Sequence, residues 1–322
     1  MWRFALRRFL IMIPQLFVLS IIVFLIAQAM PGDALTGLLN PDWDYEQMAA
    51  QRELLGLNNP WYVQYWDWIV GVVTRFDFGR SFTWQQPVTA IIGERLGNTL
   101  RLSFLTLVIM YAIAIPLGII SGRHHDTWKD KLITGYTYLG FAMPVMIMGL
   151  LVLFIFGFNL GWFPTGGSVA PGMSSDMGLA YHLSRLHYVA LPAISVALIS
   201  TVGTVQYLRG EIIDMEQREF IVAVRAKGAD EKRVYNKHIL RNSLLPIAAF
   251  LGFQLALLIS GAILTESLFS FPGMGSLFIE SITGRDFSVM TAIVMLLGTA
   301  TIVGSFLSDL IMMMVDPRIE IE

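Results

Sequence analysis

The sequence contains no cysteine. It therefore cannot form a disulfide, hold zinc or an iron–sulfur cluster through thiolates, or use a cysteine nucleophile. Charged residues make up only 14% of the 322 positions, whereas soluble domains carry about 25%. Because a soluble chain of this length would divide into domains that each need a polar surface, a soluble protein is excluded. The formal net charge of −2 also argues against a general attraction to nucleic acid.

Apolar residues are in excess: they make up 55% of the chain, and the mean hydropathy is +0.62. Disordered chains are polar, so this composition indicates a polytopic membrane protein. A bilayer requires about 20 mostly apolar residues per helix. The stretches that meet this length are 9–29, 102–121, 132–158, 188–208, 244–268 and 289–315. The sequence therefore predicts an all-α membrane protein with about six transmembrane helices.

The first stretch has a basic start like that of a signal peptide. Its apolar run is longer than the usual 7–15 residues, so we interpret it as an uncleaved anchor. With six spans, both termini lie on one side of the membrane, and that side carries 15 of the 22 lysines and arginines. The positive-inside rule therefore places both termini in the cytoplasm.

These spans predict the domain organisation. Residues 1–30 form the cytoplasmic N-terminus and first transmembrane helix, and residues 31–101 an extracytoplasmic insertion. Residues 102–315 form a core domain of five transmembrane helices, and residues 316–322 a cytoplasmic tail. We expect short amphipathic helices in the insertion, which contains the aromatic run WYVQYWDWIVGVV.

The cytoplasmic segment 209–242 has 8 basic and 6 acidic residues. Residues 210–227 are rich in helix formers, and Gly228 is suited to end that helix in a left-handed conformation. Asp230 stands where it can cap a second helix, which would run to about Asn242. One interpretation is a solvated loop that obeys the positive-inside rule. The other is a helical hairpin, tied to two spans, that docks a soluble partner.

FIVAVRAKG followed by HILRNSLLP resembles the ATPase-docking loop of ABC importer permeases. Other fragments along the chain are similar, in sequence and in order, to one branch of that family. They are LRRFLIMIP, MPGDAL, LLGLNNPWYVQYWDW, FDFGRSF, NLGWFPTGG, ILTESLFSFPGMGSL, GRDFSVM and VDPRIE. The chain resembles the B-type permease subunit of oligopeptide/dipeptide ABC importers over nearly its whole length. It departs from the pattern at Phe220, where the family usually has Tyr, and at Val224, where it usually has Thr or Ala.

The resemblance implies a type I ABC importer permease in the bacterial inner membrane, one that transports short peptides and is not itself an enzyme. Its expected partners are a C-type permease in a heterodimer, two cytoplasmic ATPases and an extracytoplasmic peptide-binding protein. The chain lacks a GxxxxGK[ST] loop, so ATP and Mg²⁺ are expected in the ATPases and no cofactor in this chain. The residues expected to dock the ATPase are Phe220, Ala223, Arg225, Ala226, Lys227, Gly228, Arg241, Asn242, Leu245 and Pro246.

Proline presets one backbone dihedral and glycine frees the next, so FPGMG predicts a tight turn in which Gly273 takes a positive φ. The resemblance places this turn beside the outer gate. The residues expected at this gate or along the translocation path are Gln254, Glu266, Pro272, Gly273 and Gly275. A carboxylate at membrane depth is usually functional, but Glu266 fits equally well as an interfacial residue that faces water. Gln206 and Gln254 can line the path, although hydrogen bonding between helices is the commoner role.

Other functions remain as alternatives. The same architecture can import nickel or oligosaccharides, but the spacing of the histidines does not favour a metal site. A stand-alone channel would not need the charged hairpin, and a membrane enzyme would need paired catalytic residues that the spans do not show.

Overall fold

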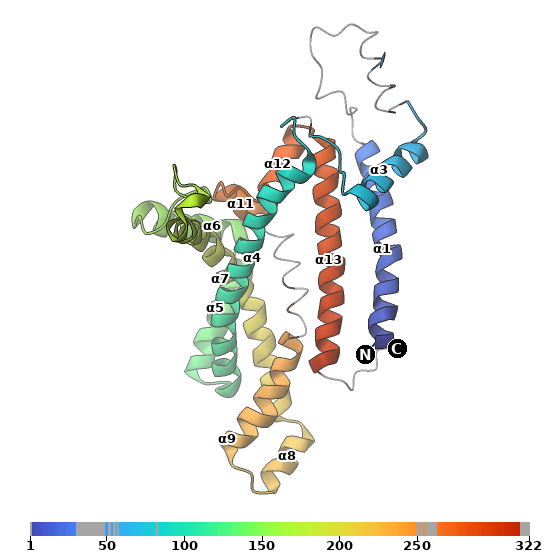
Figure 1. The fold of residues 1–322 in the computed structure, drawn as a ribbon. Coiled ribbons are helices and arrows are strands. Elements are labelled where there is room, and N and C mark those ends of the chain that lie inside the picture. The colour runs from blue at the N-terminus through green and yellow to red at the C-terminus, as the bar shows by residue number, and fades with distance from the viewer. Residues whose placement is uncertain are drawn as a thin grey trace. The chain divides into compact units, whose positions relative to one another are not determined.

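The computed structural model describes residues 2–29, 49, 50, 53, 56, 58–81, 83–248, 251, 254 and 263–315. These residues are mostly helical (Figure 1). The α-helices are α1 (Trp2–Ala29), α3 (Trp61–Arg75), α4 (Val88–Arg123), α5 (Trp128–Ala142), α6 (Val145–Val152), α7 (Leu179–Glu216), α8 (Glu219–Ala226), α9 (Glu231–Arg233), α11 (Ile263–Leu268), α12 (Met274–Thr283) and α13 (Phe287–Val315). Two π-helices, η1 (Leu153–Asn159) and η3 (Val234–Leu240), and a 3₁₀ helix, η2 (Ser175–Met177), complete the named elements.

Four of the described helices, α1, α4, α7 and α13, are long and apolar enough to cross a membrane. They correspond to four of the six predicted spans. About half of the fifth predicted span, 244–268, falls outside the described residues. The all-helical membrane architecture is therefore confirmed, while the number of six transmembrane helices stays a prediction.

The third predicted span, 132–158, is not one straight helix. It consists of α5 followed by α6 and η1, and the two parts are bent by 107° at the break. Met143, which precedes Pro144, is extended with a ψ of 121°. A proline disfavours the helical conformation of the preceding residue, which accounts for the bend.

The chain divides into two compact units. One contains residues 2–99 and 272–303, and the other contains residues 100–271 and 304–322 with Met1. In the first unit, apolar side chains from α3, α4, α12, α13 and the loop before α4 form a core of Val72, Phe78, Val88, Ile91, Ile92, Met274, Leu277, Val289, Ala292 and Ile293.

Asp286 fixes the loop before α4 within this first unit. Its buried carboxylate accepts hydrogen bonds from Ser81 Oγ at 2.5 Å and from the Thr83 backbone N–H at 3.0 Å. It also accepts from the Val289 N–H at 3.2 Å, so the same side chain caps the start of α13. The second half of the predicted insertion is thus joined to the C-terminal helix of the same unit.

In the second unit, α4 and α7 approach each other closely at two glycines. A Cβ atom on Gly118 would lie 2.9 Å from Leu208, and one on Gly122 would lie 2.8 Å from Ile212. The two glycines are four residues apart, which is the spacing that lets membrane helices pack closely. Leu208 and Ile212 are also part of the buried cluster that continues into the segment 209–242.

Candidate functional site

The helical hairpin predicted for residues 209–242 forms, but its first arm is two helices and not one. α7 ends at Glu216, and α8 begins at Glu219 after Arg218, which is extended with a ψ of 137°. The expectation of one helix over 210–227 is therefore wrong. The break brings Ile221 of α8 into a buried cluster with residues of α7 and η3, and this apolar burial outweighs the helix propensity of the segment.

Gly228 forms the turn between the two arms. Its φ is +76°, so the predicted left-handed conformation is confirmed. The Gly228 N–H donates to the Arg225 carbonyl at 2.9 Å, and the Lys227 N–H donates to the Ala223 carbonyl at 3.2 Å. These bonds satisfy carbonyls at the end of α8.

The second arm begins where expected but differs in detail. Asp230 is the N-cap of α9, yet its side chain makes no capping hydrogen bond. Its backbone carbonyl instead accepts from the N–H groups of Arg233 and Val234, each at 2.9 Å. The predicted second helix continues as the π-helix η3 and then as an α-helix through residue 248. π-Helical turns are frequent at functional sites.

α8 has a buried face and an exposed face. Ile221 is fully buried, whereas the Phe220 side chain is 46% exposed. Ala223 and Ala226 are exposed, and because they are three residues apart they lie on the same face of α8. The two small side chains leave room for a neighbouring protein surface.

Arg225 ties α8 to both neighbouring helices. Its Nη2 lies 2.6 Å from Glu231 Oε1 at the start of α9 and 3.3 Å from Glu216 Oε1 at the end of α7. The hydrogen bond from Arg225 holds the pKa of the Glu231 carboxyl below its ordinary value. A residue expected to touch the ATPase is therefore also a brace within the hairpin.

The other expected docking residues lie on the helix over 241–248. Arg241 is exposed, whereas Asn242, Leu245 and Pro246 are half-buried. Asn242 Nδ2 donates to the His238 carbonyl at 2.5 Å. These four residues follow η3 and do not lie at the tip of the hairpin with Gly228.

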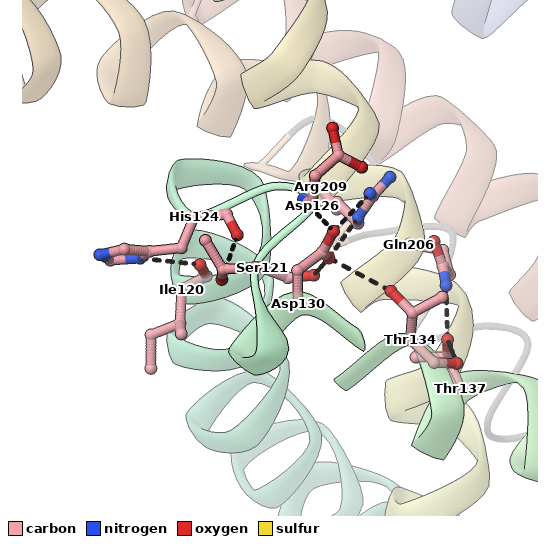
Figure 2. Close-up of polar contacts among 10 residues, drawn as sticks. Ile120, Ser121, His124, Asp126, Asp130, Thr134, Thr137, Gln206 and Arg209 are labelled. Carbon is pink, nitrogen blue, oxygen red and sulfur yellow. Dashed lines mark hydrogen bonds and ion pairs between the residues drawn. The ribbon is translucent and has the colours of Figure 1, made fainter. Parts of the chain in front are cut away.

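A largely buried polar cluster lies where α7 passes the start of α5 (Figure 2). Arg209 donates to the Asp130 carboxylate through Nε and Nη2, each at 2.7 Å. The same carboxylate accepts from Ser121 Oγ at 2.5 Å, the Asp126 N–H at 2.9 Å and Thr134 Oγ1 at 3.2 Å. Both Asp130 oxygens therefore accept hydrogen bonds, which compensates for the burial of this carboxylate.

Two further contacts extend this cluster. Gln206 Nε2 donates to Thr137 Oγ1, a second polar contact between α7 and α5, so for Gln206 the role between helices is confirmed. The Arg123 guanidinium lies 4.7 Å from the centre of the Tyr235 ring in η3. The turn between α4 and α5 is thus held against both α7 and the second arm of the hairpin.

Sequence reasoning missed this cluster. Asp130 and Arg209 are 79 positions apart, and each fits an ordinary loop or helix end when read alone. The available signal was a charged residue beside a long apolar run: Asp130 lies two positions before a predicted span, and Arg209 directly follows one.

Two residues expected along the path lie in the same unit as the hairpin. Glu266 is fully buried in α11, which contradicts the alternative in which it faces water. Its backbone carbonyl accepts from the Phe271 N–H at 2.7 Å. Gln254 is half-buried, with its Nε2 3.8 Å from Met110 Sδ of α4.

The other expected gate residues lie in the unit that contains α12. The Pro272 carbonyl accepts from Asn98 Nδ2 at 2.8 Å, and the Gly273 N–H donates to Ser276 Oγ at 3.0 Å. Gly273 has a φ of −113°, so the expectation of a positive φ is wrong. The turn is the start of α12, which also contains Gly275 in its first turn and begins where the Met274 N–H donates to Thr99 Oγ1 at 2.8 Å.

The described residues contain no group of three His, Asp or Glu side chains arranged to hold a metal ion. His124 Nδ1 lies 3.1 Å from the Ile120 carbonyl, and His187 Nε2 lies 2.9 Å from the Trp162 carbonyl. These rings bond to backbone groups.

Two families cover the chain. The family described as binding-protein-dependent transport system inner membrane component matches residues 114–321, and the N-terminal family of such components matches residues 1–103. The oligopeptide transport system permease protein AppB of Bacillus subtilis (strain 168) is 35% identical over 98% of this chain and 99% of its own length. The glutathione transport system permease protein GsiC of Escherichia coli (strain K12) is 30% identical over 99% of both chains.

Solved structures agree with the fold. The MetNI methionine ABC transporter in an inward-facing conformation matches 70% of this chain and 97% of its own chain, with a TM-score of 0.56 and 14% identity. An amino acid ABC transporter crystallised with histidines matches 69% of this chain and 92% of its own, with a TM-score of 0.51 and 15% identity. At this identity the likeness shows the fold alone.

Proposed function

Because the chain belongs to the family of binding-protein-dependent transport system inner membrane components, we propose that it imports short peptides as one membrane subunit of an ATP-driven transporter. The relatives that cover its full length are named as oligopeptide and glutathione permeases. Peptide cargo is therefore favoured over nickel or oligosaccharides. The chain provides a path and a mechanical connection, and partner subunits perform the ATP chemistry.

The observation that carries the docking proposal is the two-faced helix α8. Its buried Ile221 fixes it to α7 and η3, while Phe220, Ala223 and Ala226 remain exposed at the end of the hairpin. An apolar side chain beside two alanines suits the surface of a folded protein partner better than it suits water. We assign this face to the ATPase.

Movement of the docked helix would reach the spans through defined contacts. Arg225 joins α8 to Glu216 at the end of α7. Arg209, two turns earlier on α7, holds Asp130 at the start of α5. A displacement of α8 by its ATPase would thus be passed to α7 and from α7 to α5. We propose that this connection opens and closes the path.

The complete machine would contain a C-type permease beside this subunit, two ATPases that bind ATP and Mg²⁺, and an extracytoplasmic receptor that delivers the peptide. This chain would bind no cofactor of its own. Its expected gate residues, Gln254, Glu266, Pro272, Gly273 and Gly275, remain part of this proposal.

Copurification tests the docking face. Ala223→Glu places a charged side chain on the exposed face of α8 and should reduce recovery of the ATPase with the membrane subunit at least several-fold. Lys232→Gln, on exposed α9, is the matched control and should copurify normally. Normal ATPase recovery with Ala223→Glu would show that α8 is not the docking helix.

A transport assay tests the cargo. Proteoliposomes that contain the complete transporter should take up a labelled oligopeptide in the presence of ATP and the receptor. Uptake of nickel or of an oligosaccharide, with no uptake of dipeptides or oligopeptides, would reject the peptide assignment while leaving the docking proposal intact.

A further inference from the structure

α3 is held against the final part of α1 (Figure 1). The Tyr65 hydroxyl and Ser20 Oγ are 2.8 Å apart and buried. The Tyr65 ring centre lies 5.4 Å from that of Phe24, and Gln28 Nε2 donates to Gln64 Oε1 at 3.0 Å. Ser20, Phe24 and Gln28 are spaced by four residues and therefore share one face of α1.

A second face of α3 is apolar and exposed. Trp66 is 65% exposed and Val73 is 69% exposed, and their spacing of seven residues places them on the same side of the helix. Tyr62, four residues before Trp66, belongs to the same stripe and is also exposed. Asp67 and Thr74 are exposed on a different side. α3 therefore has three faces, one packed on α1, one apolar and one polar.

Phe76 extends the apolar face beyond the end of the helix. It is the C-cap residue, with a left-handed φ of 51°, a conformation that is unfavourable for a bulky side chain. Its ring is nevertheless 74% exposed. The Phe76 N–H donates to the Val72 carbonyl at 3.2 Å, so the left-handed residue ends the helix. An exposed aromatic ring at this end enlarges an apolar face, which points to a ligand outside the described chain.

The depth of α3 along α1 indicates what that ligand is. Its contacts run from Gln28 at the end of α1 to Ser20, about 12 Å further along the helix at 1.5 Å per residue. They therefore lie within the half of the bilayer core, about 15 Å thick, that the end of α1 reaches. α1 exposes apolar residues over the same stretch: Phe17, Val18, Ile22, Leu25 and Ile26. These are residues that lipid covers in a transmembrane helix. The apolar face of α3 thus continues a surface that already faces lipid.

We propose that α3 is an interfacial helix that lies in the membrane leaflet reached by the end of α1. Tyr62, Trp66, Val73 and Phe76 would enter the lipid, while Asp67 and Thr74 would face water. Trp and Tyr are enriched at this boundary because their rings are apolar and their tips are polar. Amphipathic helices bind lipid in the same orientation. The helix would thereby fix the outer end of α1 relative to the bilayer.

Spin labels on single cysteines test this proposal cleanly, because the native sequence contains no cysteine. The variants are Trp66→Cys and Val73→Cys on the apolar face, with Asp67→Cys and Thr74→Cys as matched neighbours. The complete transporter in lipid nanodiscs is probed by collision with oxygen, which enters lipid, and with a nickel chelate, which stays in water. The oxygen-to-nickel ratio should be several-fold higher at positions 66 and 73 than at 67 and 74.

Two results would overturn the proposal. Equally low ratios at all four positions would place α3 in water. Protection of positions 66 and 73 from both probes would show that a protein partner covers this face. If Trp66→Cys fails to assemble, Tyr62→Cys reports from the same stripe. None of these outcomes depends on which cargo the transporter carries.

Discussion

Replacement of Asp130 with asparagine should uncouple the docked ATPase from transport while leaving docking intact. The carboxylate accepts five hydrogen bonds, two of them from Arg209 and three from Ser121, Asp126 and Thr134. An asparagine amide has one acceptor oxygen and one donor group. Because Arg209 donates to both carboxylate oxygens, either orientation of the amide sets an NH₂ group against an Arg209 donor.

The size of the effect follows from the burial of the two partners. Breaking a fully buried ion pair costs about 3–5 kcal/mol. The Asp130 side chain is 4% exposed but that of Arg209 is 25% exposed, so water would partly solvate the released guanidinium. A loss of about 1.5–3 kcal/mol is therefore expected, the range for hydrogen bonds to charged groups. At 1.4 kcal/mol for each factor of ten, this shifts the balance between joined and separated α5 and α7 by about 10- to 150-fold.

The assay compares ATPase activity of the reconstituted transporter with and without peptide-loaded receptor. Asp130→Asn should copurify with the ATPases normally. Its stimulated ATPase activity and its uptake should fall about tenfold or more, because the contact between α5 and α7 is weakened by about 1.5–3 kcal/mol. Asp214→Asn is the matched control, because it makes the same chemical change at an exposed position of α7. A disulfide between Thr137→Cys and Gln206→Cys, which replace a contacting pair on the same two helices, should restore coupling in the Asp130→Asn background. Wild-type stimulation and uptake by Asp130→Asn, or failure of that variant to assemble, would refute the reasoning.

Three further predictions concern the hairpin, the topology and the packing of α4. Gly228→Leu should reach the membrane normally but lose peptide-stimulated ATPase activity, because a side chain on a left-handed residue adds about 1–2 kcal/mol of strain. The control, Lys232→Gln, should behave like wild type. Full stimulation of Gly228→Leu would contradict the docking assignment. A cysteine at Ser175 should react with an impermeant maleimide on intact cells, whereas one at Lys232 should react only after permeabilisation; the reverse pattern would invert the topology. Gly122→Ala puts a Cβ atom 2.8 Å from a side chain of α7 and should destabilise the purified complex by about 1–3 kcal/mol, while Gly210→Ala, with open space around it, should not lower its thermal transition.

Local sequence signals were sufficient for features that depend on local chemistry. Composition and long apolar runs predicted the helical membrane architecture, and one glycine at the end of a helix-forming stretch predicted the left-handed turn at Gly228. The bend at Pro144 was available from the sequence too, because Met143 precedes a proline. It was missed because proline is often tolerated in transmembrane helices, as Pro116 in α4 is here.

Features that depend on tertiary packing could not be predicted in this way. The break between α7 and α8 has no glycine or proline at it, and it exists because Ile221 is buried against distant residues. The Asp130–Arg209 pair joins two helices separated by 79 positions. For Gly273, the expected positive φ came from interpreting Pro-Gly in FPGMG as a tight turn, but the glycine takes an extended conformation at the start of α12.

The contacts between α5 and α7 determine where a movement of α8 can go. Membrane helices gain no hydrophobic driving force from meeting each other, because lipid is equally apolar, so polar contacts and close packing decide which helices move together. Asp130 and Thr137 on α5 contact Arg209 and Gln206 on α7 at two separate levels. Sliding by one helical turn, about 5.4 Å, would break both contacts, so α5 and α7 are expected to move as one body. α5 ends at the 107° bend before α6, but α6 packs on α7, because Val152 lies in one buried cluster with Val189 and Leu191. A movement of α7 is therefore expected to reach α6 through this second contact as well.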